Sequence, residues 1–246
     1  MCGRYRLTQA ERFAEMSEVR LAWNPKPRYN IAPAQNVPVV LDESPGELTE
    51  VRWGLVPSWA SDLKIGSSLI NARAETAATK PAFRAAYEKR RCLVPADGFY
   101  EWQKAGSGKI PHHIGMTDGA PFAFAGLWEI WRDPMRPHDA PPIRTFTIIT
   151  GEPNNLVCSI HNRMPVIIPR ERYGEWLSPD TPKVKRAALL KAFPAEQMKV
   201  EPISDRVNSP RNDDPAILAP PAPVQYRIKP HDESAVTDDE PWLFPP

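Results

Sequence analysis

Residues 92–130 read CLVPADGFYEWQKAGSGKIPHHIGMTDGAPFAFAGLWEI, and this stretch decides the fold class. It contains four strand-like runs separated by turns rich in Gly, Pro, Asp and Ser: Cys92 to Pro95, Phe99 to Gln103, His112 to Met116 and Phe122 to Ile130. No helical pattern lies between these runs. Strands that follow one another without an intervening helix favour antiparallel sheets over a doubly wound α/β fold.

The rest of the chain repeats this pattern on both sides. Further strand-like runs cover Val37 to Leu41, Leu48 to Trp53, Arg144 to Thr150 and Pro165 to Ile168. Three helices are expected, at about residues 9–19, where Thr8 and Glu11 have capping-box spacing, at 81–90, with Pro81 in the first turn, and at 183–193. We therefore predict an α+β fold, a single domain of largely antiparallel, curled, barrel-like sheets with peripheral helices.

Length and proline content indicate the domain organisation. A chain of 246 residues can bury the core of one large domain. It contains 30 prolines, which favours short elements joined by rigid turns. From residue 219 the chain is rich in proline and acidic residues and poor in core-type residues, so we predict a domain over 1–218 and a loosely attached tail over 219–246.

Charge and cysteine usage exclude several classes. The formal net charge is +1, so a nucleic-acid site would have to be a local patch. Cys2, Cys92 and Cys158 form an odd set without metal-ligand spacing, and no signal peptide or membrane span is evident. We expect a cytoplasmic monomer with reduced thiols, no metal and no cofactor.

Cys2 directly follows the initiator methionine, and a small second residue is what methionine removal requires. Removal of Met1 would leave an α-amine and a thiol on one residue, with roughly a tenth of the amine neutral at pH 7. Such a 1,2-aminothiol condenses with an aldehyde to an imine, which the sulfur closes to a five-membered thiazolidine. The alternative is a small residue that packs as a hydrophobe.

Three further residues could carry proton-transfer or orienting roles. Asn71, in NARAE, could orient a sugar hydroxyl or an imine, or make an ordinary Asx turn. Glu101, in DGFYEW, shares a strand face with Phe99, where desolvation would raise its pKa, or it is solvated on the wet side of a sheet. His161, in SIHNRMP, is either a near-neutral acid or base or a structural histidine.

Cationic and aromatic residues supply candidate DNA contacts. Within RWGLVPSWA, Trp53 and Trp59 could stack on unpaired bases or wedge a duplex, or belong to the core. Arg4, Arg73 and Arg163 are candidate phosphate contacts, although most single arginines are simply solvated.

Several motifs in order resemble the SRAP family, the SOS-response-associated, abasic-site-processing proteins. They are Cys2-Gly3-Arg4-Tyr5, RYNIAP, RWGLVPSW, NARAE, CLVPADGFYEW, HNRMP and VNSPRNDDP, and they cover the chain to about residue 218. The resemblance implies binding to single-stranded DNA and a stable thiazolidine crosslink to abasic sites. It assigns the nucleophile to Cys2, sugar orientation to Asn71, catalysis to Glu101 and His161, and DNA contacts to Arg4, Arg73, Arg163 and the Trp53–Trp59 region.

The resulting hypothesis is a covalent sensor of abasic sites in single-stranded DNA. His161 would assist opening of the sugar ring, Glu101 would shuttle protons, and an unclosed Schiff base would permit strand cleavage as a lyase. Removal of Met1 would be a peptidase-type, autoproteolytic step. Two alternatives remain, an amidohydrolase or peptidase with an N-terminal cysteine and a noncovalent single-strand binder.

Overall fold

The computed structural model describes residues 2–106, 108–137 and 139–222. The strands are β1 (Tyr5–Leu7), β2 (Arg28–Ile31), β3 (Asn36–Leu41), β4 (Leu48–Trp53), β5 (Asn71–Arg73), β6 (Arg91–Ala96), β7 (Gly98–Ala105), β8 (Gly108–Met116), β9 (Phe122–Trp131), β10 (Ile143–Gly151), β11 (Met164–Pro165), β12 (Ile167–Ile168) and β13 (Met198–Pro202). The α-helices are α1 (Ala10–Ser17), α2 (Ala74–Ala77), α3 (Arg84–Lys89), α4 (Tyr173–Leu177) and α5 (Lys183–Leu189). Short 3₁₀ helices are η1 (Leu63–Ser68), η2 (Arg170–Arg172), η3 (Ala195–Gln197), η4 (Asp205–Asn208) and η5 (Pro215–Leu218).

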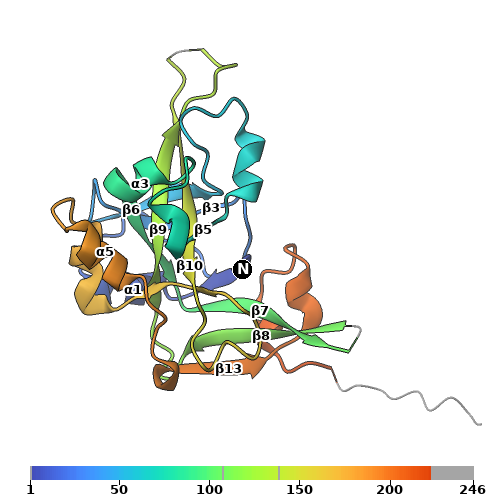
Figure 1. The fold of residues 1–246 in the computed structure, drawn as a ribbon. Helices are drawn as coiled ribbons and strands as arrows, with labels where there is room; N and C mark the ends of the chain where they lie inside the picture. Colours follow the sequence, from blue (N-terminus) through green and yellow to red (C-terminus); the bar gives the residue numbers. More distant parts are fainter. Residues whose placement is uncertain (1, 107, 138, 223–246) are drawn as a thin grey trace, which may run out of the picture.

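A small closed barrel forms the centre of the molecule (Figure 1). Its strands pair in the cyclic order β10–β4–β3–β6–β9 and back to β10. The β10–β4 pair is parallel and the other four pairs are antiparallel. Closure removes the unpaired edges that an open sheet of these apolar strands would expose. The predicted α+β class with curled, barrel-like sheets is confirmed.

A second sheet, in the order β13–β8–β7–β1–β2, lies against the barrel and is antiparallel throughout. One apolar cluster joins the two, with Cys2, Phe99 and Ile114 from the second sheet and its N-terminal extension, and Phe146 from the barrel. The N-terminus therefore lies between the two sheets (Figure 1).

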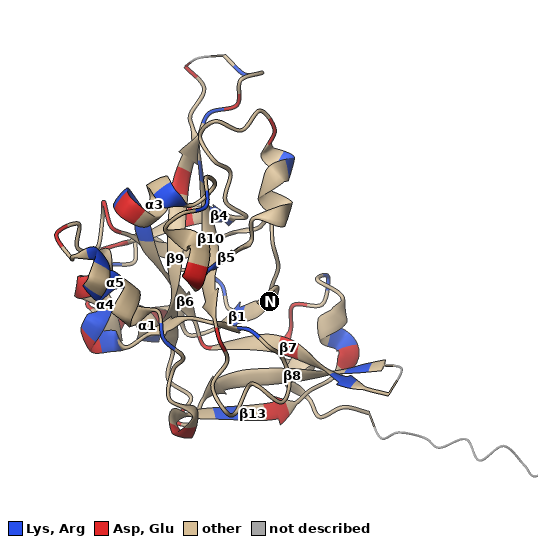
Figure 2. Ribbon diagram, viewed as in Figure 1, with Lys and Arg blue, Asp and Glu red and all other residues tan. Residues whose placement is uncertain are grey.

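The helices cover the other side of the barrel (Figure 1). A second apolar cluster joins Phe13 of α1, Tyr87 of α3, Trp176 of α4 and Leu189 of α5 to outward-facing barrel residues such as Ala125. Figure 2 shows acidic and basic residues mixed along these helices, as the net charge of +1 suggests.

The predicted helix starts and stops need correction. The N-cap of α1 is Gln9, without a side-chain capping bond, because the Thr8 hydroxyl donates instead to Asp97 Oδ2 at 2.5 Å. Helix α3 begins at Arg84, so Pro81 precedes it in a turn, and α5 ends at Leu189. In each case tertiary contacts decide the boundary.

Among the strands, the predicted runs are recovered with shifted ends, except that Pro165 to Ile168 is two separate strands. β11 pairs with β10 and β12 pairs with β9, and Val166 lies between them. The sequence missed β1, β2, β5 and β13, which are three to five residues long and carry polar residues on both sides of apolar ones.

The predicted tail begins within the described residues, since Ser204 N donates to Ala219 O at 2.7 Å, but residues 223–246 lie outside them. The division at residue 218 stays a prediction. No helix in the described part of the chain is long and apolar enough to cross a membrane.

Candidate active site

The strand that follows Cys2 is held beside the strand that carries Glu101. β1 and β7 pair with Tyr5 opposite Phe99 and Arg6 opposite Gly98. Tyr100 N donates to Arg4 O at 3.0 Å, which continues this register toward the N-terminus. The residues before Tyr5 therefore run alongside the segment that begins at Glu101.

Asn71 contacts the main chain of the candidate nucleophile. Its Nδ2 donates to the Cys2 carbonyl oxygen at 2.8 Å. β5 places it there through parallel pairing with β10, in which Asn71 lies opposite Ile148. The Oδ1 atom of Asn71 is buried and accepts no hydrogen bond within the described residues, so one acceptor remains for a ligand.

Glu101 is buried, with 3% of its surface exposed. Burial raises the pKa of its carboxyl group above the ordinary value, and the nearby His161 opposes this shift. The same carboxyl group lies close enough to Cys2 to raise the pKa of the thiol, after the larger effect of burial. Glu101 therefore lies near Cys2 and near His161, on the strand face shared with Phe99.

The thiol of Cys2 is fully buried, and its pKa lies well above the ordinary range because of burial and the Glu101 charge. It is protonated at neutral pH in this state, and its Sγ donates to Arg4 O at 3.8 Å. A reaction that uses the sulfur as nucleophile must therefore transfer this proton, and the Glu101 carboxylate is placed to receive it.

His161 is oriented by its own segment. Its Nδ1 lies 3.0 Å from Arg163 N and 3.2 Å from Arg163 O, so the main chain of Arg163 fixes the orientation of the ring. The preceding turn is held by Asn154 Oδ1, which accepts from Leu156 N and Val157 N, and by Gln103 Nε2, which donates to Ser159 O at 3.2 Å. The last bond ties this turn directly to β7.

The three arginines occupy different environments. Arg163 donates to both carboxylate oxygens of Glu75, at 2.8 and 2.9 Å, and to Thr150 O. Arg4 is partly buried and donates through one nitrogen to Asn30 Oδ1 and Val207 O. Arg73 is the last residue of β5, and its side chain is exposed. Of the three, Arg73 offers the most accessible guanidinium group.

The two tryptophans divide between core and surface. Trp53 is 1% exposed, stacks on Phe146, and donates from its indole nitrogen to Ile70 O at 2.9 Å. A ring buried in this way cannot stack on a base, so Trp53 offers no base contact in this structure. Trp59 is 65% exposed.

A close backbone crossing holds the loop that presents Trp59. A Cβ on Gly66 would lie 2.6 Å from Gly54 O, so both positions need glycine. Gly54 also has φ of +112°.

Comparison with known proteins shows the family of this chain. A family model described as SOS response associated peptidase (SRAP) matches residues 1–210. The chain belongs to the SRAP family.

Individual relatives match over nearly their whole length. The abasic site processing protein YoqW of Bacillus subtilis (strain 168) is 42% identical over 230 residues, covering 89% of this chain and 99% of that protein. YedK of Escherichia coli (strain K12), also named an abasic site processing protein, is 30% identical, with 89% and 100% covered. A crystal structure of a protein from Bacteroides thetaiotaomicron superposes with a TM-score of 0.81 at 30% identity, covering 89% and 99%.

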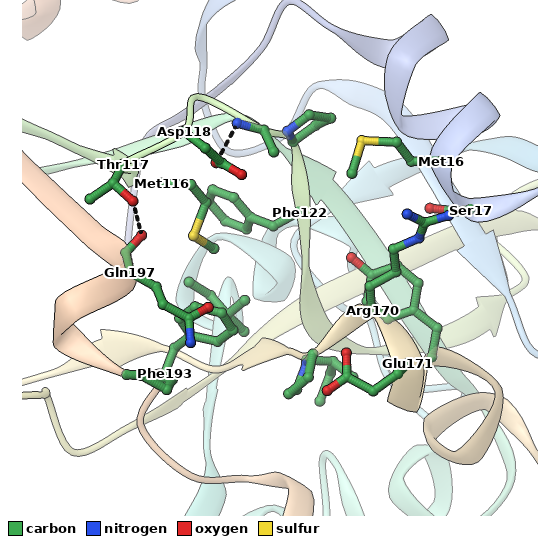
Figure 3. A pocket seen from close by; sticks show the side chains of 17 residues that line it. Met16, Ser17, Met116, Thr117, Asp118, Phe122, Arg170, Glu171, Phe193 and Gln197 are labelled. Atoms are coloured by element: carbon green, nitrogen blue, oxygen red, sulfur yellow. Dashed lines mark hydrogen bonds between the residues drawn. The ribbon is translucent and has the colours of Figure 1, made fainter.

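A well-formed pocket of this SRAP protein lies elsewhere. It has a volume of about 410 Å³ and is lined by Met16, Phe122, Arg170 and Phe193, among others (Figure 3). Cys2, Asn71, Glu101 and His161 are not among its lining residues. Within the described residues, no cluster of His, Cys, Asp and Glu is placed to hold a metal ion.

Sequence reasoning missed the residues that hold this SRAP site in place. They are Glu75, which clamps Arg163; Asn30, whose Nδ2 donates to Val207, Ser209 and Asn212; Asp213, which accepts from Tyr29 N and Asn30 N; and Asp97. Each is a polar residue inside a motif that the sequence analysis had already quoted. Their place inside these motifs was the sequence signal that could have identified them.

Proposed function

We propose that this protein recognises abasic sites in single-stranded DNA and joins them covalently to Cys2 as a thiazolidine after Met1 is removed. Two independent lines support the proposal. Asn71 donates a hydrogen bond to the Cys2 carbonyl, Glu101 lies near the Cys2 thiol, and His161 lies near Glu101. The relatives of known name are abasic site processing proteins. The contact between Asn71 and Cys2 is the observation that carries it, because it joins two motifs 69 residues apart.

The chemistry requires an aldehyde and both functional groups of Cys2. In the proposed sequence, His161 gives a proton to the ring oxygen of the abasic deoxyribose while the C1′ hydroxyl loses its proton to water, and the ring opens to the C1′ aldehyde. The neutral α-amine of Cys2 adds to C1′, and the resulting hydroxyl takes a proton from the Glu101 carboxyl group and leaves as water, which gives an iminium ion. Sγ then bonds to C1′ while its proton passes to the Glu101 carboxylate. One water is released overall and nothing is oxidised or reduced.

Each remaining group has a proposed role in this sequence. The Oδ1 atom of Asn71 accepts a hydrogen bond from a hydroxyl group of the opened sugar. Arg73 neutralises a backbone phosphate and Trp59 stacks on an unpaired base, because both are exposed. If ring closure is delayed, the same imine permits elimination of the 3′ phosphate, which is a lyase reaction. Met1 removal, by autoproteolysis or otherwise, belongs to the same proposal, as does action as an intracellular monomer.

The test is to incubate the purified protein with a single-stranded oligonucleotide bearing one abasic site and run a denaturing gel. We expect a slower band that survives heating for wild type and for Cys158→Ala, whose exposed thiol serves as the control. Cys2→Ala should give no such band, and Cys2→Ser only a labile one, since a hydroxyl closes the ring poorly. A stable adduct from Cys2→Ala, or a wild-type complex that dissociates in denaturant, would contradict the proposal.

A further inference from the structure

The strand carrying the nucleophile is paired with the strand carrying Glu101 over a very short distance. Within the described residues, the β1–β7 ladder consists of Tyr5 opposite Phe99 and Arg6 opposite Gly98. Shifting a strand by one residue turns each of its side chains to the opposite face. A ladder of two pairs, continued by the single bond from Tyr100 N to Arg4 O, resists such a shift weakly. Side-chain interactions that hold the N-terminal segment against β7 would therefore strengthen the register between Cys2 and Glu101.

Asp97 provides such interactions, directly before β7. It is 2% exposed, and its Oδ2 accepts hydrogen bonds from Thr8 N at 3.0 Å, Thr8 Oγ1 at 2.5 Å and Gln9 Nε2 at 3.3 Å. Its Oδ1 lies 3.5 Å from Arg6 Nε. Its main chain is also used, since Asp97 N donates to Arg6 O and Arg6 donates to Asp97 O.

We infer that Asp97 is a positioning residue for the crosslinking reaction, which sets the register between the segment bearing Cys2 and the strand bearing Glu101. It binds three residues of the N-terminal segment, Arg6, Thr8 and Gln9, and Glu101 follows it by four residues on a continuous strand. The inference rests on the proposed function. It also explains why Thr8 does not cap α1, since its hydroxyl is already bound to Asp97.

Substitution of Asp97 by asparagine tests the carboxylate with little change in shape. The new amide nitrogen would be a donor facing either Arg6 or the three donors that now point at Oδ2, so donor would face donor in both orientations. A displacement of about 1 Å between reacting groups can cost on the order of 10²-fold in rate. We therefore expect D97N to lower the rate constant of crosslinking at saturating DNA by about 10-fold or more.

A matched control separates positioning from general stability. Asp42 also accepts from a main-chain N–H, that of Arg91, and from the Trp128 indole, and it directly follows barrel strand β3, outside the pairing of β1 with β7. D42N should lower the melting temperature yet leave the saturated crosslinking rate within about twofold, whereas D97N should change the rate while binding of an aldehyde-free abasic analogue stays within about twofold. Equal rates for D97N and D42N at saturating DNA would overturn the inference.

A second pair of variants keeps the test decisive if D97N folds poorly. Thr8→Ser retains the hydroxyl donor and Thr8→Val removes it, so only Thr8→Val should slow crosslinking. Alkylation followed by peptide mass spectrometry adds a readout that needs no DNA, because Cys2 is buried. Cys2 should be alkylated at least threefold faster in Thr8→Val than in Thr8→Ser, and equal rates would overturn the inference. A wild type that forms no adduct contradicts the proposed function, while the alkylation result still decides the role of Asp97.

Discussion

Glu101 shows at the residue scale how the catalytic role we propose for a buried carboxyl group opposes the stability of the fold. Its folded pKa is raised by burial, so the folded state holds the proton more tightly than the unfolded chain. The fold therefore loses stability as pH rises from the unfolded toward the folded pKa, and that loss persists at neutral pH. Glutamine, a neutral side chain of nearly the same shape, avoids this loss of stability.

We accordingly expect Glu101→Gln to melt at a higher temperature than wild type at pH 7 to 8, with the difference shrinking toward pH 4. The same variant should crosslink about 10²-fold more slowly, because the carboxylate base is gone. Thermal unfolding across pH and single-turnover crosslinking measure the two effects. A variant that is less stable than wild type at pH 8 and equally fast would show that Glu101 is an ordinary structural carboxylate.

Trp53 and Trp59 belong to one motif and differ completely in environment. Trp53→Ala should lower the free energy of unfolding by about 3–5 kcal/mol, because it empties a packed core position. Trp59→Ala should leave unfolding nearly unchanged and weaken binding to single-stranded DNA by about 1–3 kcal/mol, through lost stacking. Denaturant titration and fluorescence anisotropy measure these quantities. Unchanged DNA affinity in Trp59→Ala would remove this residue from the proposed binding surface.

The environment of each tryptophan could not be predicted from the motif alone. Both lie in RWGLVPSWA, and only the turn at Gly54 and its contact with Gly66 separate a barrel strand from an exposed loop. The motif resemblance assigns Asn71, Glu101 and His161 to the same reaction as Cys2, and the structure joins Asn71 to Cys2 through a hydrogen bond. The catalytic roles of these residues stay predictions.

At the scale of elements, Arg163 joins the segment after β5 to the segment before β11. Its bond to Glu75 lowers the pKa of that carboxyl group, so the pair stabilises the fold above the ordinary glutamate pKa and loses this contribution as pH falls through the lowered value. Arg163→Ala should lower the free energy of unfolding by about 1–3 kcal/mol at pH 7 and by less at pH 3.

Arg73 provides the contrast on the same surface. Arg73→Ala should leave the melting temperature unchanged and reduce the dependence of DNA binding on salt by about one unit of slope or less. Anisotropy titrations at several salt concentrations, beside thermal melts, separate the two arginines. The opposite pattern, with Arg163→Ala changing only the salt slope, would mean that Arg163 leaves Glu75 to bind phosphate.

Long elements could be predicted from the sequence, and very short ones could not. The long, mostly buried runs of β9 and β10 were recognisable because burial alone favours them as strands. β1 and β5 were not, since each is three residues long and exists through pairing with a distant strand. The Thr8 cap failed for a related reason, because Asp97, 89 residues away, binds the hydroxyl.

At the scale of the whole molecule, the class of fold was predictable and its closure was not. The order of strands indicated antiparallel sheets, but the ring closes through the parallel pairing of β4 with β10, far apart in sequence. That closure, with the second sheet packed against it, buries Cys2 between two sheets. The enclosed position matters for the central claim, because the sulfur must bond to C1′ inside the protein.

Mass spectrometry of the adduct tests that claim most directly. The abasic oligonucleotide is crosslinked to wild-type protein, the complex is denatured, treated with iodoacetamide, and digested with protease and nuclease. We expect the N-terminal peptide to lack Met1, to carry the abasic deoxyribose with loss of one water, and to resist alkylation at Cys2 because its sulfur is bonded to C1′. An adduct whose Cys2 thiol is alkylated, or one that retains Met1 or lies on another residue, would contradict the account.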